Sequence, residues 1–312
     1  MLQLIKGLYV ATDVIDTIQK RKRYHTEISE GDTRMHNPPK AYKNAEFLNS
    51  PEARAIRILC EYEEPRKRFA QHHVEDTIVI FGSARSKPLD VVQNEIATIE
   101  RDLARDNTPE YHAVLQQALA KAKSAERLAV YYEKTRELAK KLTEWDMNRK
   151  GKKRYYISTG GGPGMMEAAN RGASEVVGGE SVGLAISLPH ENNLNPYVTP
   201  SLGFEFHYFF TRKYWFMYLC KAMVITPGGF GTLDELFEVL TLRQTKKITR
   251  NIPTVLFGTA YWNDVMNIPK MVEWGTIAPS DLEMFIVTDD VDDAFNYLVA
   301  GIESHENDPD EE

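Results

Sequence analysis

Two glycine-rich turns carry the residues whose types and spacing could do chemistry in this chain. The first reads GGGPG at 160–164, and the second reads PGGFGT at 227–232. Each turn follows an apolar, strand-like run and precedes a helical pattern, so each is predicted at a strand-to-helix junction. Successive bare N–H groups at a helix N-terminus form a cradle for anions. The pattern therefore predicts a phosphate site that includes Gly161, Gly162 and Gly164.

The familiar nucleotide motifs do not fit these turns. The third glycine position of a dinucleotide-binding fingerprint holds Met165, and no lysine follows the glycines as a Walker loop requires. A purely structural interpretation, in which the glycines only make tight turns, stays open for either turn taken alone. Two such turns in one sheet favour a ligand site.

A carboxylate and a guanidinium accompany the second turn, and each has a structural alternative. Thr232 and Glu235 have the spacing of a capping box, in which the glutamate only satisfies a helix N–H, and spacing alone favours that reading. Arg212 lies in the basic first turn of an apolar helical pattern, where it could be merely solvated. Because the helix dipole disfavours a cation at that end, a negatively charged ligand nearby would explain the arginine better.

The elements that must position these residues alternate along the chain. Apolar, β-branched runs are predicted as strands at 76–81 and 155–159, and again at 181–187, 203–207, 222–226, 253–257 and 284–288, with helical patterns around most of them. Alternating strands and helices form a parallel sheet that is covered on both faces. We therefore expect an α/β fold, a Rossmann-like doubly wound parallel sheet with both glycine turns at its carboxyl edge.

Three additions to this core are predicted. Residues 1–75 are expected to form a helical extension ahead of a core domain at 76–300, and residues 301–312 an acidic, disordered tail. Residues 87–128 interrupt the core with two helix-prone stretches on either side of Pro109, which predicts an inserted helical hairpin. A separate helix is expected near 129–147.

Composition narrows the classes of protein that need to be considered. The 312 residues carry a net charge of −7 and contain no apolar run long enough to span a membrane. Lys6 interrupts the apolar start of the chain, which argues against a signal peptide. We expect a cytoplasmic protein without nucleic-acid or membrane partners. Cys60 and Cys220 lie in apolar helical patterns and are predicted as buried free thiols.

A compound motif carries a resemblance to a known family. TRK at 211–213, PGGFGTLDE at 227–235 and GGGPGMMEAANRGA at 160–173 together resemble the LONELY GUY (LOG) family of nucleoside 5′-monophosphate phosphoribohydrolases, with its PGGxGTxxE signature. The resemblance covers about 76–300, apart from the insertion. Similar proteins are often labelled lysine decarboxylases, but nothing in this sequence supports the pyridoxal-phosphate chemistry which that label demands.

The resemblance implies hydrolysis of the N-glycosidic bond of a nucleoside monophosphate, without a metal or other cofactor. It implies that Arg212 and Glu235 are catalytic. The implied substrate-binding residues are Lys213, Gly228, Gly229, Gly231, Thr232 and Thr241, with Glu191 as a further match of uncertain alignment. By loop position we add Ser83, Arg85 and Glu167.

Alternatives remain at this stage. The same scaffold could bind a nucleotide or a phosphorylated cofactor as a carrier without cleaving it. Cytokinin ribotides, purine monophosphates and pyrimidine monophosphates are all open as substrates. Family resemblance further implies a homodimer or higher homo-oligomer. The apolar residues of 214–219 are candidate contact surface, although burial within one chain would explain them equally well.

Overall fold

The computed structural model describes residues 38–105, 108–149, 151–188 and 194–306. The chain divides into two compact units, Met1–Arg54 and Ala55–Glu312. The described part of the first unit holds short helices only: η1 (Ala41–Lys43), α2 (Ala45–Leu48) and η2 (Pro51–Ala53). Helix α3 (Arg54–Gln71), which the sequence interpretation placed in the N-terminal extension, lies in the second unit except for its first residue.

Within the described residues, seven parallel strands form one sheet in the order β4-β3-β2-β1-β5-β6-β7. Their bounds are β1 Asp76–Phe81, β2 Tyr155–Thr159, β3 Ser181–Ile186, β4 Gly203–Phe206, β5 Cys220–Ile225, β6 Thr254–Phe257 and β7 Ile286–Thr288. Every strand expected from the sequence is present, to within a few residues at its ends. The predicted Rossmann-like, doubly wound α/β fold is confirmed.

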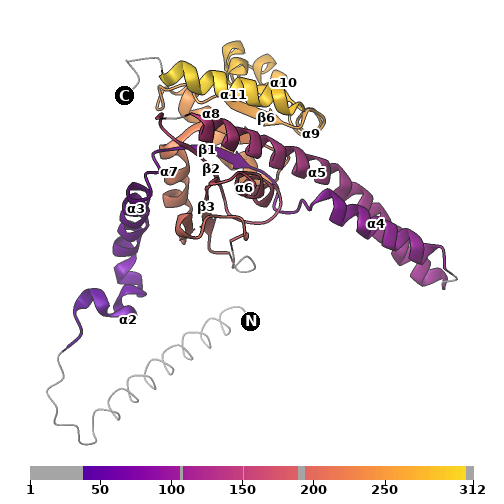
Figure 1. Ribbon diagram of the computed structural model, residues 1–312, viewed down its shortest axis with the longest axis horizontal. Helices are drawn as coiled ribbons and strands as arrows, with labels where there is room; N and C mark the ends of the chain where they lie inside the picture. Colours follow the sequence, from indigo (N-terminus) through magenta and orange to yellow (C-terminus); the bar gives the residue numbers. More distant parts are fainter. Residues whose placement is uncertain (1–37, 106–107, 150, 189–193, 307–312) are drawn as a thin grey trace, which may run out of the picture. The chain divides into compact units, whose positions relative to one another are not determined.

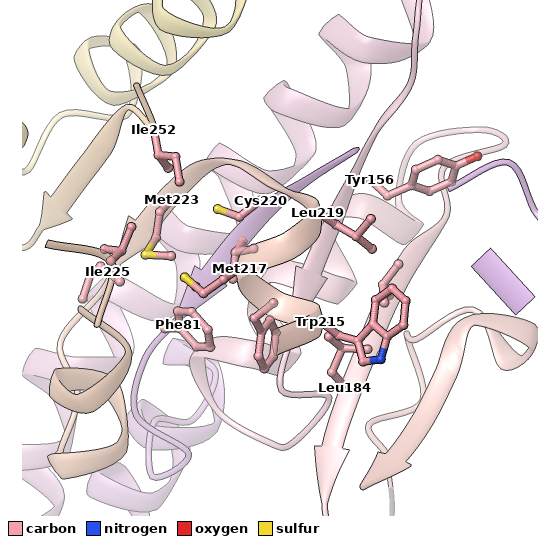
Figure 2. Close-up of a cluster of buried hydrophobic side chains, with 14 of the residues drawn as sticks. Phe81, Tyr156, Leu184, Trp215, Met217, Leu219, Cys220, Met223, Ile225 and Ile252 are labelled. Carbon is pink, nitrogen blue, oxygen red and sulfur yellow. The ribbon is translucent and has the colours of Figure 1, made fainter. Parts of the chain in front are cut away.

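Helices cover both faces of this sheet (Figure 1). One face packs against α3, α7 (Phe209–Leu219), α8 (Phe230–Gln244) and α9 (Thr259–Val265), and the other against α5 (Pro109–Asn148), α6 (Met165–Ser174) and α11 (Val291–Glu306). Side chains alternate along β1, so that Val79 and Phe81 enter the first core while Ile78 and Ile80 enter the second. Figure 2 shows the first core, where Trp215 and Met217 of α7 lie against the strands. The near-continuous apolar strands reflect this burial on both faces.

Helix α4 (Leu89–Leu103) packs along the first half of α5 as the predicted hairpin (Figure 1). The separate helix expected near 129–147 does not exist, because α5 runs unbroken from Pro109 to Asn148. No glycine or further proline follows Pro109 within that span, so nothing interrupts the helix. A single helix therefore joins the insertion to the core, where its residues Leu138 and Leu142 are fully buried.

The carboxyl end of the described chain is ordered further than expected. Helix α11 continues to Glu306, six residues beyond the predicted boundary at 300. The Glu306 carboxylate pairs with Arg149 and accepts a hydrogen bond from the Tyr155 hydroxyl at 3.0 Å, which ties the helix end to the core. The rest of the predicted tail, 307–312, lies outside the described residues.

The remaining helices are α10 (Ile268–Glu273) and the short 3₁₀ segments η3 (Pro200–Leu202) and η4 (Pro279–Met284). Both cysteines carry free thiols, but only Cys220 is buried, and burial raises its pKa to about 12. Cys60 is exposed on α3, so its predicted burial is wrong. None of the described helices is both long and apolar enough to cross a lipid bilayer.

Candidate functional site

The loops that follow β1, β2 and β5 meet at the carboxyl edge of the sheet. β1 lies between β2 and β5, so the chain changes direction across the sheet there, and ligands of open α/β sheets bind at such a point. The Ser83 amide after β1 donates to the Pro227 carbonyl of the second glycine turn at 2.9 Å, while the Ser83 carbonyl accepts from the Met165 amide after the first turn at 3.0 Å. Both glycine turns are thereby fastened to one residue.

The first turn is held by a buried polar network. The Gly161 amide donates to Thr159 Oγ1 at 2.9 Å, and Asn195 Nδ2 donates to the Gly161 and Gly162 carbonyls at 3.1 and 3.0 Å. Asn170, which is fully buried, accepts from both Thr159 Oγ1 and Asn195 Nδ2. The Gly161 amide, predicted as a phosphate donor, is therefore engaged inside the protein.

Close packing explains two glycines of this turn. Gly164 has φ of +74°, and a Cβ there would lie 2.2 Å from the Ser83 carbonyl oxygen. At Gly160 a Cβ would lie 2.5 Å from Arg212 Nη2, so the bare backbone makes room for the guanidinium. The first turn thus owes much of its composition to packing, including packing around a predicted catalytic side chain.

The second turn has a different character. Helix α8 begins after the N-cap residue Gly229, no side chain caps it, and its first intrahelical bond runs from Leu233 N to Gly229 O at 3.1 Å. A Cβ added to Gly229 or Gly231 would meet no atom within 4 Å, so packing does not require glycine there. Gly228 is different, because a Cβ on it would lie 2.1 Å from Thr232 Oγ1. The open amides at this helix N-terminus form the better candidate for an anion cradle.

The capping-box interpretation of Glu235 is wrong. Thr232 lies inside α8, three residues after the N-cap Gly229, and Glu235 lies another three residues along the helix. At that position a glutamate side chain cannot satisfy an orphan N–H of the first turn. The carboxylate of Glu235 must therefore be explained by its surroundings.

Those surroundings are buried and contain several charged side chains. Glu235 is only 4% exposed, and its Oε2 atom has no hydrogen-bond partner among the described residues. Burial raises the pKa of its carboxyl to about 7, against the opposing effect of the positive charges on Lys213 and Arg212. Native proteins rarely leave a buried carboxylate oxygen unpartnered, and such groups concentrate at functional sites.

Arg212 lines a cavity of about 320 Å³ beside the first turn. Its Nε donates to the Leu184 carbonyl at 2.7 Å, and its guanidinium lies 5.1 Å from the centre of the Phe216 ring. The other lining residues are Gly160, Gly162, Met166, Ala185, Ile186, Leu194, Gly203, Phe204 and Glu205. Glu235 and the second turn do not line this cavity, so Arg212 and Glu235 are coupled by charge rather than by a shared wall.

The remaining predicted residues have varied places. Lys213 Nζ bridges Asp234 and Glu238 at 2.9 Å each, so its charge is already balanced, and these bonds raise its pKa although burial lowers it. Glu167 accepts a hydrogen bond from the Tyr132 hydroxyl at 2.8 Å, which links α6 to α5. Thr241 is exposed on α8, beyond Glu235.

Two further predictions concern the loop after β1. Ser83 Oγ accepts the Arg85 amide at 3.1 Å, a local turn bond, while the Arg85 side chain is exposed. Glu191 lies outside the described residues. Among the residues that the structure describes, no three His, Cys, Asp or Glu side chains cluster as metal ligands would.

Sequence reasoning missed the residues that hold these groups in place. Asn170 and Asn195 fix the first turn, and Glu61 of α3 binds the N-terminus of α7, next to Arg212. Glu61 also supplies negative charge at that helix end, so a ligand is not needed to explain a cation there. These contacts join segments that are 25 to 147 residues apart, and no local pattern signals them.

Comparison with known proteins supports the resemblance. The parallel sheet and its two turns define an α/β protein of Rossmann-like type. Residues 166–298 match a family described as "Possible lysine decarboxylase", the description commonly attached to LOG-type proteins, and this confirms the resemblance seen in the sequence. The matched segment contains both Arg212 and Glu235.

The chain also has a match among the solved structures. That solved structure is the "structure of Moco Carrier Protein from Chlamydomonas reinhardtii". The two sequences are 17% identical and the TM-score is 0.41. The match covers 74% of this chain and 99% of that one. None of the curated protein sequences matches it.

Proposed function

We propose that this protein hydrolyses the N-glycosidic bond of a nucleoside 5′-monophosphate, releasing the free base and ribose 5-phosphate. The observation that carries the proposal is the Glu235 carboxylate, which is 4% exposed, has an Oε2 atom without a partner among the described residues, and is coupled to Arg212. It lies on the helix that follows the open glycine turn. Purine, pyrimidine and cytokinin ribotides are all candidate substrates, and no cofactor is part of the proposal.

The chemistry follows from the charge that develops in the reaction. Breaking a ribosyl C–N bond builds positive charge on the sugar ring, as in glycoside hydrolysis. An ionised Glu235 would stabilise that charge or orient the attacking water. A buried carboxylate with few competing hydrogen bonds acts more strongly than one in water.

Arg212 has a different task. A guanidinium does not release its proton in proteins, so Arg212 cannot be a general acid. It would bind the phosphate, ribose or base through charge-assisted hydrogen bonds. The open amides of the second turn would hold the 5′-phosphate, which positions the reacting bond and so raises the rate as well as the affinity. A nucleoside that lacks the phosphate should therefore be a poor substrate.

The proposal is tested by incubating the protein with a panel of nucleoside monophosphates and measuring free base and ribose 5-phosphate. Glu235→Gln should lower kcat by at least about a hundredfold, the usual contribution of a positioned acid or base. Activity of the wild type should fall as the pH drops below about 7, where burial leaves Glu235 protonated.

A matched control distinguishes chemistry from packing. Asp234 lies beside Glu235 on α8 but is 59% exposed, and Lys213 keeps Glu238 as a partner when Asp234 is neutral. Asp234→Asn should therefore retain most activity. Equal losses in both variants, or a Glu235→Gln variant that unfolds, would contradict the role given to Glu235.

A second candidate function rests on the position of the cavity. Arg212 lines it and Glu235 does not, which is the arrangement expected if a nucleotide or phosphorylated cofactor is bound and carried without cleavage. Recovery of an intact bound ligand after prolonged incubation with the protein would favour this carrier function.

The proposal also covers the oligomeric state of the protein and its location in the cell. Most of the predicted contact surface at 214–219 is buried within the chain, since Trp215, Phe216, Met217 and Leu219 are at most 6% exposed. Phe209, Phe210 and Tyr218 of α7 are between 55% and 58% exposed, which suits contact with a second copy of the chain. We propose a cytoplasmic homodimer or higher homo-oligomer. Light scattering at several protein concentrations measures the assembly.

A further inference from the structure

Helix α7 has no side-chain cap, and Glu61 of α3 binds the two residues that precede its first turn. The N-cap residue Tyr208 makes no side-chain capping bond, and the first turn of α7 contains no acidic residue. Instead the Glu61 carboxylate of α3 accepts the His207 amide on Oε1 at 2.8 Å and the Tyr208 amide on Oε2 at 3.3 Å. Figure 1 shows α3 running beside α7.

Further bonds make this contact a firm one. The Thr211 hydroxyl donates to Glu61 Oε2, and Trp215 Nε1 donates to the Glu61 backbone carbonyl at 3.0 Å. Thr211 and Trp215 are 6% and 2% exposed, so these bonds are shielded from water. One residue of α3 thus binds two amides just before α7 and two side chains within its first two turns.

The residue next to Thr211 is Arg212. The guanidinium of Arg212 is oriented by its bond to the Leu184 carbonyl and by the space that Gly160 leaves. Both contacts depend on how α7 is rotated about its axis and on its position along that axis. A second residue of α3 contacts two further lining residues of the cavity, since Arg68 donates to the Gly203 carbonyl at 2.6 Å and lies 3.9 Å from the Phe204 ring centre. Helix α3 therefore contacts two of the elements that form the cavity.

We infer that Glu61 is a positioning residue for Arg212, which makes α3 a part of the active site rather than an accessory extension. Arg212 has this role only if the proposed function, or the carrier alternative, places a ligand against it. The carboxylate of Glu61 acts through the backbone of α7 and does not touch the substrate.

The test compares Glu61→Gln with Glu63→Gln. Glu63 lies on the same helix, is 53% exposed, and bonds only Arg66 within the described structure, so its variant controls for the loss of one charge on α3. Gln at position 61 keeps one acceptor but turns an NH₂ group toward the amides of α7. Thr211→Val is the second variant, because it removes one bond to Glu61 while preserving side-chain shape.

Two readouts separate positioning from mere stability. In protein labelled with ¹⁵N-arginine, the Arg212 Nε–H resonance, assigned by its absence in Arg212→Lys, should shift or broaden in Glu61→Gln and move less in Thr211→Val. It should be unchanged in Glu63→Gln. With nucleoside monophosphate, kcat should fall at least about tenfold in Glu61→Gln at a temperature well below its unfolding midpoint.

The outcomes are distinguishable. An Arg212 resonance that is identical in the wild type and Glu61→Gln overturns the inference, as does an unchanged kcat in a folded Glu61→Gln protein. A wild type that cleaves no monophosphate overturns the proposed function, and the resonance then still decides whether Glu61 positions Arg212.

Discussion

The two glycine-rich turns look alike in sequence but differ in what their backbone does. In the first turn the Gly161 amide and carbonyl are bonded inside a buried network, and Gly164 is required by its positive φ and close packing. In the second turn Gly229 and Gly231 face open space, and the helix N-terminus has no side-chain cap. Glycines of the first turn thus allow close packing, whereas Gly229 and Gly231 of the second turn leave the helix N-terminus open.

The buried polar groups differ in the same way. Asn170 behind the first turn makes several hydrogen bonds, whereas Glu235 behind the second has a carboxylate oxygen without a partner among the described residues. Satisfied polar groups rigidify a site, and an unsatisfied one stores free energy that a substrate can release. Under the proposed function, the second turn would carry the chemistry and the first would support it.

The largest effect should come from filling the first turn. In Gly164→Ala the new Cβ would lie 2.2 Å from a backbone oxygen at φ of +74°. We expect a loss of about 2–5 kcal/mol in the free energy of unfolding, from the left-handed backbone and the overpacking together. Urea denaturation measures it. A variant as stable as the wild type would show that packing does not demand this glycine.

The next effect is on the free energy of unfolding of Glu235→Gln, which we expect to rise rather than fall. Burial raises its folded pKa from 4.5 to about 7, so the folded state holds a proton that the unfolded state has released. Stability from this group is therefore present below pH 4.5 and is lost as the pH rises through 7. Glu235→Gln should gain about 3 kcal/mol over the wild type between pH 4.5 and pH 8.

This gain is read from urea unfolding of both proteins at the two pH values. If the difference between Glu235→Gln and wild type stays constant with pH, the carboxyl group is not buried as described. A gain in stability together with a loss of turnover would sharpen the contrast with the first turn, where substitutions should lower stability.

The smallest effect on stability should come from the second turn. Gly231→Ala adds a Cβ that meets no atom within 4 Å, and alanine favours a helix over glycine by up to about 1 kcal/mol. The thermal midpoint should stay or rise slightly, while affinity for nucleoside monophosphate falls about tenfold, or about 1.4 kcal/mol. Calorimetric titration and thermal melts measure both. Unchanged affinity would argue against a phosphate at this turn.

Much of the fold could be predicted because its strands are apolar on both faces and alternate with helices along the chain. β1, β2 and β5 stand out as β-branched runs before glycine turns, and a parallel sheet follows from alternating strands and helices, whereas the order of its strands comes from the structure alone. The extent of α5 was missed because a change in apolar spacing near residue 128 resembles a helix end. It marks instead the point where the helix leaves α4 and enters the core.

The site was less predictable, since its geometry depends on residues far apart in the chain. Thr232 and Glu235 match a capping box in sequence, yet the helix begins earlier, directly after the N-cap residue Gly229, so the local pattern misleads. The exposure of Thr241 and the ion pairs of Lys213 depend on how α7 meets α8. The bracing of α7 by Glu61 joins residues about 150 positions apart, beyond any local rule.

The hydrogen bond from Ser83 to Pro227 has a consequence for the order of folding. β1 leaves the ribosome long before β5, yet the two are neighbours in the centre of the sheet. Contacts of such high sequence separation close late and slow the folding of a domain. A nascent chain that ends before Pro227 lacks the acceptor for the Ser83 amide, so the link between β1 and the second glycine turn forms only after Pro227 has been synthesised.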